Sequence, residues 1–342
     1  MNGQERGGSI GTVVRDGGPT APLRAGSEEP IAPPVSVLTG KPLKPSRGRG
    51  RPGRRQATIV AYVFLLPSII GLLVFIAYPV VTSFYYSFTD WDGMGPAEWI
   101  GFENYVYLFT IDPTFWPSIR ATFYFVLLTV PSTLVCGFLL ALLLNRRYPG
   151  VKIFRTIFYL PVVLPGIAVL TLWAYIYEPS YGLANQILGG LGLPTSRWIY
   201  SETMAMPSIV LIGLWGVGGT MIIFLAGLQN VPQELYEAAQ VDGAGPIRRL
   251  FSITLPMMTP IILLQVILCL NLAFQAFNQV QVLTDGGPGT STYLLGYKIF
   301  VNAFGTYPQL GLASAEAWIM LVLVVGATAL ALKTSSAWVY EE

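Results

Sequence analysis

Six long hydrophobic runs follow one another along this chain, and the first begins near residue 60. Each is close to the roughly 20 residues that an α-helix needs to cross the hydrocarbon core of a bilayer. Lipid offers no hydrogen bonds to the backbone, so we expect every run to be helical. The pattern predicts an all-α membrane protein with six transmembrane helices, near residues 60–86, 121–144, 156–177, 205–228, 257–280 and 312–332.

Helix-distorting residues are unevenly spread over these runs. The first three contain prolines, at positions Pro67, Pro79, Pro131, Pro161 and Pro165. Kinked helices are tolerated in membranes and often frame a transport pathway. The fourth run is instead rich in glycine, at Gly213, Gly216, Gly218 and Gly219. Small residues of this kind favour close packing between helices rather than ligand binding.

The first 56 residues differ from the rest because they are rich in Gly, Pro, Ser and Arg and show no apolar periodicity. Such a segment cannot bury a core, and we expect residues 1–56 to form a disordered, basic cytoplasmic tail. Residues 57–342 then form the six-helix membrane domain. The tail's basic residues are typical of a topology anchor, with a contact to lipid or nucleic acid as the alternative.

Basic residues also predict the orientation of the helices. Lys and Arg number ten in the tail, four in the loop 145–155, two in the loop 229–256 and one after the last run. The opposite side holds three, Arg120, Arg197 and Lys298. This asymmetry places both termini in the cytoplasm.

Composition narrows the function further. The chain is 53% hydrophobic and 11% charged, against roughly 25% charged in soluble domains. It has no histidine, and its two cysteines lie inside apolar runs, so histidine-based catalysis, a histidine metal site and a disulfide framework are not expected. No Walker-type phosphate loop is present. The sequence therefore predicts a non-catalytic protein that binds no metal or nucleotide itself.

A long polar loop, residues 229–256, separates the fourth and fifth runs. Pro232 suits the first turn of a short helix, Gly243 the left-handed residue that ends it, and Pro246 the start of a second helix. We expect Pro256 to stop that second helix before the fifth span. This design suits a docking element for a partner, although an amphipathic loop on the lipid surface fits almost as well.

Polar side chains inside the spans are candidates for a solute pathway. Asn271, Gln275 and Asn278 fall at i, i+4 and i+7, which predicts one helical face. Amides exchange hydrogen bonds with hydroxyl groups and suit a neutral sugar, but they also join transmembrane helices to one another. Glu316 lies about a turn into the last span and is a functional candidate for that reason, unless it sits in the headgroup layer.

The loop carries the motif through which the chain resembles a known family. Leu235-Tyr-Glu-Ala-Ala-Gln-Val-Asp-Gly-Ala244, followed by Phe251-Ser-Ile-Thr-Leu-Pro256, is similar to the "EAA" loop of binding-protein-dependent permeases, the membrane subunits of bacterial ATP-binding-cassette importers. Phe64-Leu-Leu-Pro67, Gly101-Phe-Glu-Asn-Tyr105 and Thr284-Asp-Gly-Gly-Pro288 resemble the carbohydrate-uptake branch, which includes the maltose, trehalose and glycerol-3-phosphate permeases. The resemblance covers about residues 58–333.

This resemblance implies a type I importer permease fold in the bacterial inner membrane, with a cytoplasmic coupling helix. It also implies a second permease subunit, two ATPase subunits that bind ATP and Mg, and an extracytoplasmic binding protein that delivers the solute. The residues carried over as coupling the permease to the ATPase are Glu237, Ala238, Ala239, Asp242, Gly243 and Arg248, with Glu237 to Ala239 as the contact tip and Gly243 as the bend. The expected solute is a di- or oligosaccharide, with glycerol 3-phosphate or another small polar solute as alternatives. An ion-coupled secondary transporter is the alternative to an ATP-driven importer.

Overall fold

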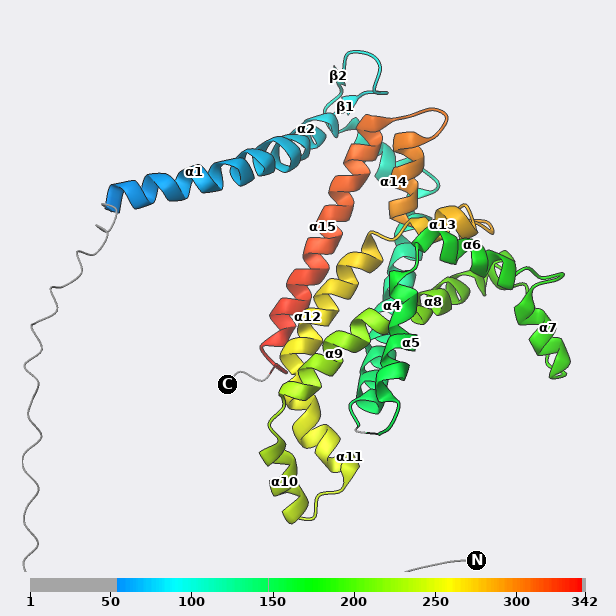
Figure 1. Ribbon diagram of the computed structural model, residues 1–342. Coiled ribbons are helices and arrows are strands. Elements are labelled where there is room, and N and C mark those ends of the chain that lie inside the picture. Colours follow the sequence, from blue (N-terminus) through cyan, green and yellow to red (C-terminus); the bar gives the residue numbers. More distant parts are fainter. Residues whose placement is uncertain (1–53, 147, 340–342) are drawn as a thin grey trace, which may run out of the picture. The chain divides into compact units, whose positions relative to one another are not determined.

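The computed structural model describes residues 54–146 and 148–339 (Figure 1). The predicted tail up to residue 53, and Arg147, lie outside these described residues. The chain divides into two units between Phe64 and Leu65. Of the first unit, residues 54–64 are described, and they are helical. The second unit contains the remaining elements.

The described chain is almost entirely helical, as predicted. The first half contains α1 (Arg54–Leu72), α2 (Tyr78–Tyr86), α3 (Glu103–Thr110), α4 (Phe115–Leu144), α5 (Val151–Val163), α6 (Gly166–Ile176) and α7 (Leu183–Gly190). The second half contains α8 (Ala205–Trp215), α9 (Gly218–Asn230), α10 (Gln233–Val241), α11 (Pro246–Arg249), α12 (Leu255–Phe274), α13 (Asn278–Leu283), α14 (Leu295–Phe304) and α15 (Leu310–Ser335). Two two-residue strands, β1 (Thr89–Asp90) and β2 (Glu98–Trp99), form an antiparallel hairpin.

Four continuous helical stretches are long and apolar enough to cross a membrane: Tyr62–Tyr86, Phe115–Leu144, Pro246–Phe274 and Leu310–Ser335. The other two predicted spans are each broken into two helices. The pair α5 and α6 bends by 98°, and the pair α8 and α9 bends by 51°. The described residues thus hold four spans, or six if each bent pair counts as one.

Two of the prolines follow a turn of π-helix, whereas Pro67 and Pro131 lie inside continuous α-helices without one. One turn of π-helix, Leu73–Ala77, comes before Pro79, and another, Leu250–Thr254, comes before Pro256. A π-turn shifts the hydrogen-bond register, which accommodates a residue that has no N–H. The prediction that Pro256 stops the second helix of the polar loop is therefore wrong, because α11, the π-turn and α12 form one helix of 29 residues.

The core of the second unit lies where its long helices pack together. Figure 1 shows α4 beside α9 and α12, and α12 beside α15. The predicted close packing holds at Gly218, where an added Cβ would lie 2.1 Å from the backbone oxygen of Phe158 on α5. It does not hold at Gly213 or Gly219, where a Cβ would meet nothing within 4 Å.

Candidate functional site

The element that carries the family motif is α10 together with the turn that follows it. Helix α10 ends at Val241, and Gly243 takes φ +74°, the left-handed conformation predicted for it. The Gly243 amide donates to the Gln240 oxygen (3.1 Å), and the Ala244 amide donates to the Ala239 oxygen (2.8 Å). These two bonds form a Schellman motif, which satisfies the last carbonyls of the helix and fixes the direction in which the chain leaves it.

Helices α10 and α11 lie together at one end of the second unit, beyond α9 and α12 (Figure 1). The hydroxyl groups of Tyr236 and Thr254 are 2.9 Å apart, which joins α10 to the π-turn after α11. The predicted contact residues are mostly accessible: Glu237, Ala238, Asp242, Gly243 and Arg248 are exposed, and Ala239 is half-buried. The structure therefore brings these six residues together on α10, α11 and the turn between them. We call this exposed region, residues 233–249, the elbow.

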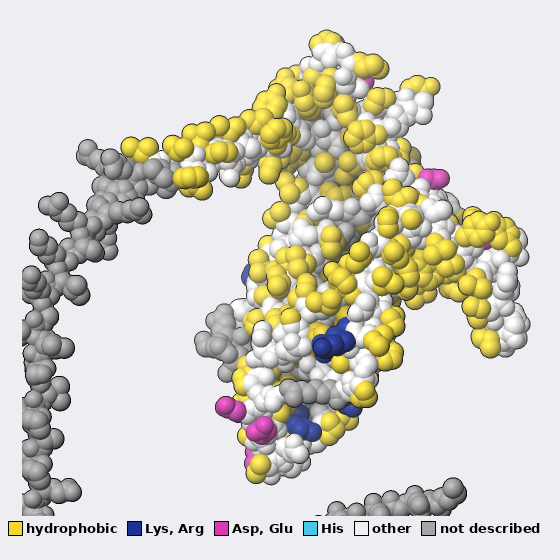
Figure 2. All heavy atoms as spheres, in the orientation of Figure 1, with side chains coloured by type: hydrophobic (Ala, Val, Ile, Leu, Met, Phe, Trp, Pro, Cys, Tyr) yellow, Lys and Arg dark blue, Asp and Glu magenta, His cyan; other side chains and the backbone are white. Residues whose placement is uncertain are grey.

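The elbow and the π-turn that follows it also expose large apolar side chains that the sequence did not single out as contacts. Val241 is 88% exposed, Ile247 72% and Phe251 63%. Figure 2 shows acidic and basic side chains near this end of the unit, in contrast to the largely hydrophobic flanks. Exposed apolar residues rimmed by polar ones are typical of protein-binding surfaces. The sequence signal for this apolar surface was the spacing of Val241, Ile247 and Phe251 on the two sides of Gly243.

The three candidate amides, Asn271, Gln275 and Asn278, do not share one helical face. Helix α12 ends at Phe274, so Gln275 caps it and Asn278 begins a separate helix, α13. Asn271 and Gln275 line a hollow of about 520 Å³ against α15. Asn278, with Gln279, lines a different hollow of about 480 Å³. The predicted face assumed an unbroken helix through Asn278, and the break after Phe274 overturns it.

The hollow beside Asn278 lies at the two helix breaks. Its lining comes from both sides of the α5–α6 bend, including Pro161 and Gly166, and from the end of α8, including Trp215 and Gly216. Broken helices leave backbone groups free to face a solute, which is why many transporters place their binding sites at such breaks. The lining of both amide hollows contains no charged residue.

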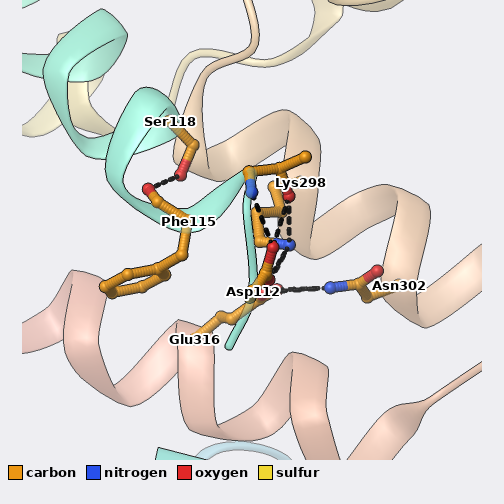
Figure 3. A network of polar contacts seen from close by, with 7 residues as sticks. Asp112, Phe115, Ser118, Lys298, Asn302 and Glu316 are labelled. Carbon is orange, nitrogen blue, oxygen red and sulfur yellow. Dashed lines mark hydrogen bonds and ion pairs between the residues drawn. The ribbon is translucent and has the colours of Figure 1, made fainter. Parts of the chain in front are cut away.

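Glu316 lies in neither of these hollows but in a buried network of charges (Figure 3). The Lys298 Nζ contacts Asp112 Oδ2 at 2.7 Å and Glu316 Oε1 at 3.2 Å, and it donates to Thr114 Oγ1 at 3.0 Å. The Asn302 amide lies 2.9 Å from both carboxylate oxygens of Glu316. Glu316 is 0% exposed, so the structure separates it from the three candidate amides and does not place it in contact with solvent.

This network joins three segments that are distant in sequence: the loop before α4, helix α14 and helix α15. Burial raises the pKa of Asp112, but hydrogen bonds from Lys298 and Thr114 outweigh it and hold that pKa below its usual value. Burial lowers the pKa of Lys298, but attraction to Glu316 and Asp112 outweighs it and raises that pKa. Both side chains are therefore charged near neutral pH.

Comparison with known proteins decides the family. Residues 133–340 match the model of the "binding-protein-dependent transport system inner membrane component". That match covers more than half of the chain. The chain belongs to this family of ABC importer permeases.

The permease is similar to proteins from several organisms. It is 39% identical over 84% of its length to the probable ABC transporter permease protein YesP of Bacillus subtilis, of which the match covers 94%. It is 35% identical over 82% of its length to the trehalose/maltose transport system permease protein MalF of Thermococcus litoralis, of which 94% is covered. Among solved structures, a chain of a bacterial alginate ABC transporter in complex with an alginate-pentasaccharide-bound periplasmic protein matches with a TM-score of 0.72, at 26% identity, covering 82% of the permease and 94% of that chain.

Within the permease, therefore, the elbow of α10 and α11 is the family's motif in three dimensions. The described residues contain no group of three or more His, Cys, Asp or Glu side chains that could hold a metal ion. The site consists of two short helices, α10 and α11, with exposed contact candidates, and of two hollows whose linings contain no charged residue.

Proposed function

We propose that this permease pairs with a second permease subunit to form the pathway for a sugar, delivered by an extracytoplasmic binding protein. Two separate ATPase subunits supply the energy, and each permease docks on one of them through α10. In this proposal both termini and the α10–α11 elbow lie in the cytoplasm, as the distribution of basic residues predicts.

The geometry of the elbow is the observation that supports transport driven by separate ATPase subunits. Its contact residues, Glu237 to Ala239, sit on a short exposed helix whose exit angle is fixed by the Schellman turn at Gly243. A helix anchored in this way transmits the movement of a docked partner to α9 and α12, which flank it. Nucleotide binding must then favour one state of the pathway over the other by about 5 kcal/mol to switch it almost completely.

The uncharged hollows support a sugar as the solute. Amide side chains donate and accept hydrogen bonds, which matches the hydroxyl groups of a carbohydrate. Trp215 adds an aromatic surface to the hollow that contains Asn278 and Gln279. A phosphorylated solute would require a cation, and neither hollow has one. The name of the trehalose/maltose permease points to the same class, and a di- or oligosaccharide is the solute we favour.

Two measurements test this proposal. A sugar panel screened against the cognate binding protein gives the solute, because that protein selects it. Uptake of the selected sugar into proteoliposomes that hold both permeases and the ATPase should then depend on ATP. Binding of a peptide or a polyamine by the binding protein, with no sugar bound, would refute the sugar assignment but leave the importer assignment intact.

A further inference from the structure

Another hollow of the permease, separate from the two that contain the amide residues, lies between α2, α3, α4 and α15. It has a volume of about 470 Å³ and is lined by Phe84, Tyr105, Phe109, Phe115, Trp116, Ile119, Trp318, Ile319, Val322 and Leu323. Every lining residue is aromatic or aliphatic. The sugar pathway uses none of them, so the hollow calls for a different kind of occupant.

Two of the three polar side chains in the lining are hydrogen-bonded within the protein, and the third, Trp318, packs edge-on against Phe84 with no hydrogen bond to the described residues. The Tyr105 hydroxyl donates to Ser87 Oγ at 2.9 Å, and the Trp116 indole N–H donates to the Phe109 oxygen at 3.2 Å. A hollow whose walls offer a single indole N–H is unfavourable for water or sugar, because neither would recover most of the hydrogen bonds it loses. Its occupant must therefore be apolar.

The walls belong to three of the candidate membrane spans, which supply Phe84, Trp116 and Val322. These three side chains are 48%, 51% and 68% exposed, so the hollow opens onto the surface that faces lipid in a membrane protein. The lipid-facing surface of the permease therefore continues into the hollow. A fatty acyl chain is the apolar molecule available there.

A positive charge lies near this surface. Arg120 follows Trp116 by four residues on α4, which places both on one face of the helix, and Arg120 is exposed. A long arginine side chain near the end of a span extends toward the headgroup layer, where it attracts lipid phosphate. We propose that the hollow is a binding site for a phospholipid, whose acyl chain fills it and whose phosphate pairs with Arg120.

Occupancy would also protect the buried charges. Phe115 lines the hollow and lies beside the network of Asp112, Lys298 and Glu316 (Figure 3). Trp318 and Ile319 follow Glu316 on α15 and form another part of the wall. An acyl chain against these residues keeps water away from that side of the network.

Photolabelling with a phosphatidylglycerol that carries a diazirine on its acyl chain tests the site in the full-length permease, purified with its partner subunits and reconstituted. We expect adducts to concentrate on Trp116 and Val322. Ile119→Trp, which fills the hollow, should reduce this labelling about tenfold. The matched control is Leu127→Trp, at a 69% exposed position of the same helix outside the hollow, and it should not.

A second comparison examines the phosphate. Arg120→Gln should weaken labelling by the phosphatidylglycerol probe about two- to fivefold, as expected for one exposed ion pair, and leave labelling by a matched diacylglycerol probe unchanged. Val322→Trp provides an independent filling variant if Ile119→Trp fails to fold. Adducts spread evenly along α4 and insensitive to both filling variants would overturn the proposal, as would cross-linking of the hollow to the second permease subunit.

Discussion

At the scale of single residues, the buried charged network around Lys298 is where we expect substitutions to destabilise the permease strongly. One cation serves two buried carboxylates, and each partner comes from a different segment. Removing one member of such a cluster leaves an uncompensated charge in a poorly solvated place, which costs far more than the net contribution of the intact pair.

Lys298→Met should therefore be strongly destabilising, by about 3–5 kcal/mol, because Asp112 and Glu316 would face each other without a cation. Glu316→Gln should cost only about 1 kcal/mol, since Lys298 keeps Asp112 and the glutamine still accepts a hydrogen bond from Asn302. Thermal unfolding of the purified protein measures both. Equal losses would contradict the arrangement of the network.

The Glu316→Gln variant also tests whether Glu316 has a structural role or a role in transport. Because this side chain lines neither amide hollow, Glu316→Gln should leave the range of transported solutes unchanged once protein amounts are matched. An altered solute range in uptake assays would instead place Glu316 on the pathway.

Substitutions of Asn278 and Asn271 form a matched pair that tests whether the hollow at the helix breaks binds the solute. Asn271 already donates to the Ile267 oxygen of its own helix at 3.0 Å, whereas no hydrogen bond of the Asn278 amide to the described residues is found. Asn278→Ala should raise the KM for uptake about three- to tenfold, the effect of one lost hydrogen bond to solute, and Asn271→Ala less. Equal effects of the two substitutions on KM would argue against the hollow at the helix breaks.

At the scale of helices, the packing of α9 against α5 depends on one glycine. Gly218→Ala would place a methyl group 2.1 Å from the Phe158 oxygen, and the resulting displacement should cost about 1–3 kcal/mol. Gly219→Ala is the control, since its Cβ meets nothing and alanine favours a helix. Thermal unfolding should therefore give a lower Tm for Gly218→Ala than for Gly219→Ala. The reverse order would rule out this contact.

The long hydrophobic runs predicted the location of all six apolar segments, because the length of a span is imposed by the bilayer. They did not predict which spans are continuous. Proline lies at the break near Pro165 but also inside the continuous helices at Pro67 and Pro131, and the π-turn before Pro256 leaves no mark in hydropathy. The sequence marked Glu316 as a candidate but did not predict its pairing, because Lys298 and Glu316 become partners only when α14 and α15 pack together.

At the scale of the whole permease, the central claim is that movement of an ATPase reaches the pathway through α10. The turn at Gly243 carries that claim, because its left-handed conformation is strained for a side chain that is branched at Cβ. Gly245 offers a close control. It has φ −68° and ψ 167°, which valine adopts readily, and like Gly243 it has nothing within 4 Å of an added Cβ.

ATP-driven uptake in proteoliposomes that contain both permeases, the ATPase and the binding protein tests this claim most directly. We expect Gly243→Val to abolish uptake and release the ATPase from the purified complex, while the permease remains in the membrane and Gly245→Val behaves like the unsubstituted protein. If Gly243→Val still imported solute in step with ATP hydrolysis, or if uptake proceeded without the ATPase, α10 would not be the coupling element.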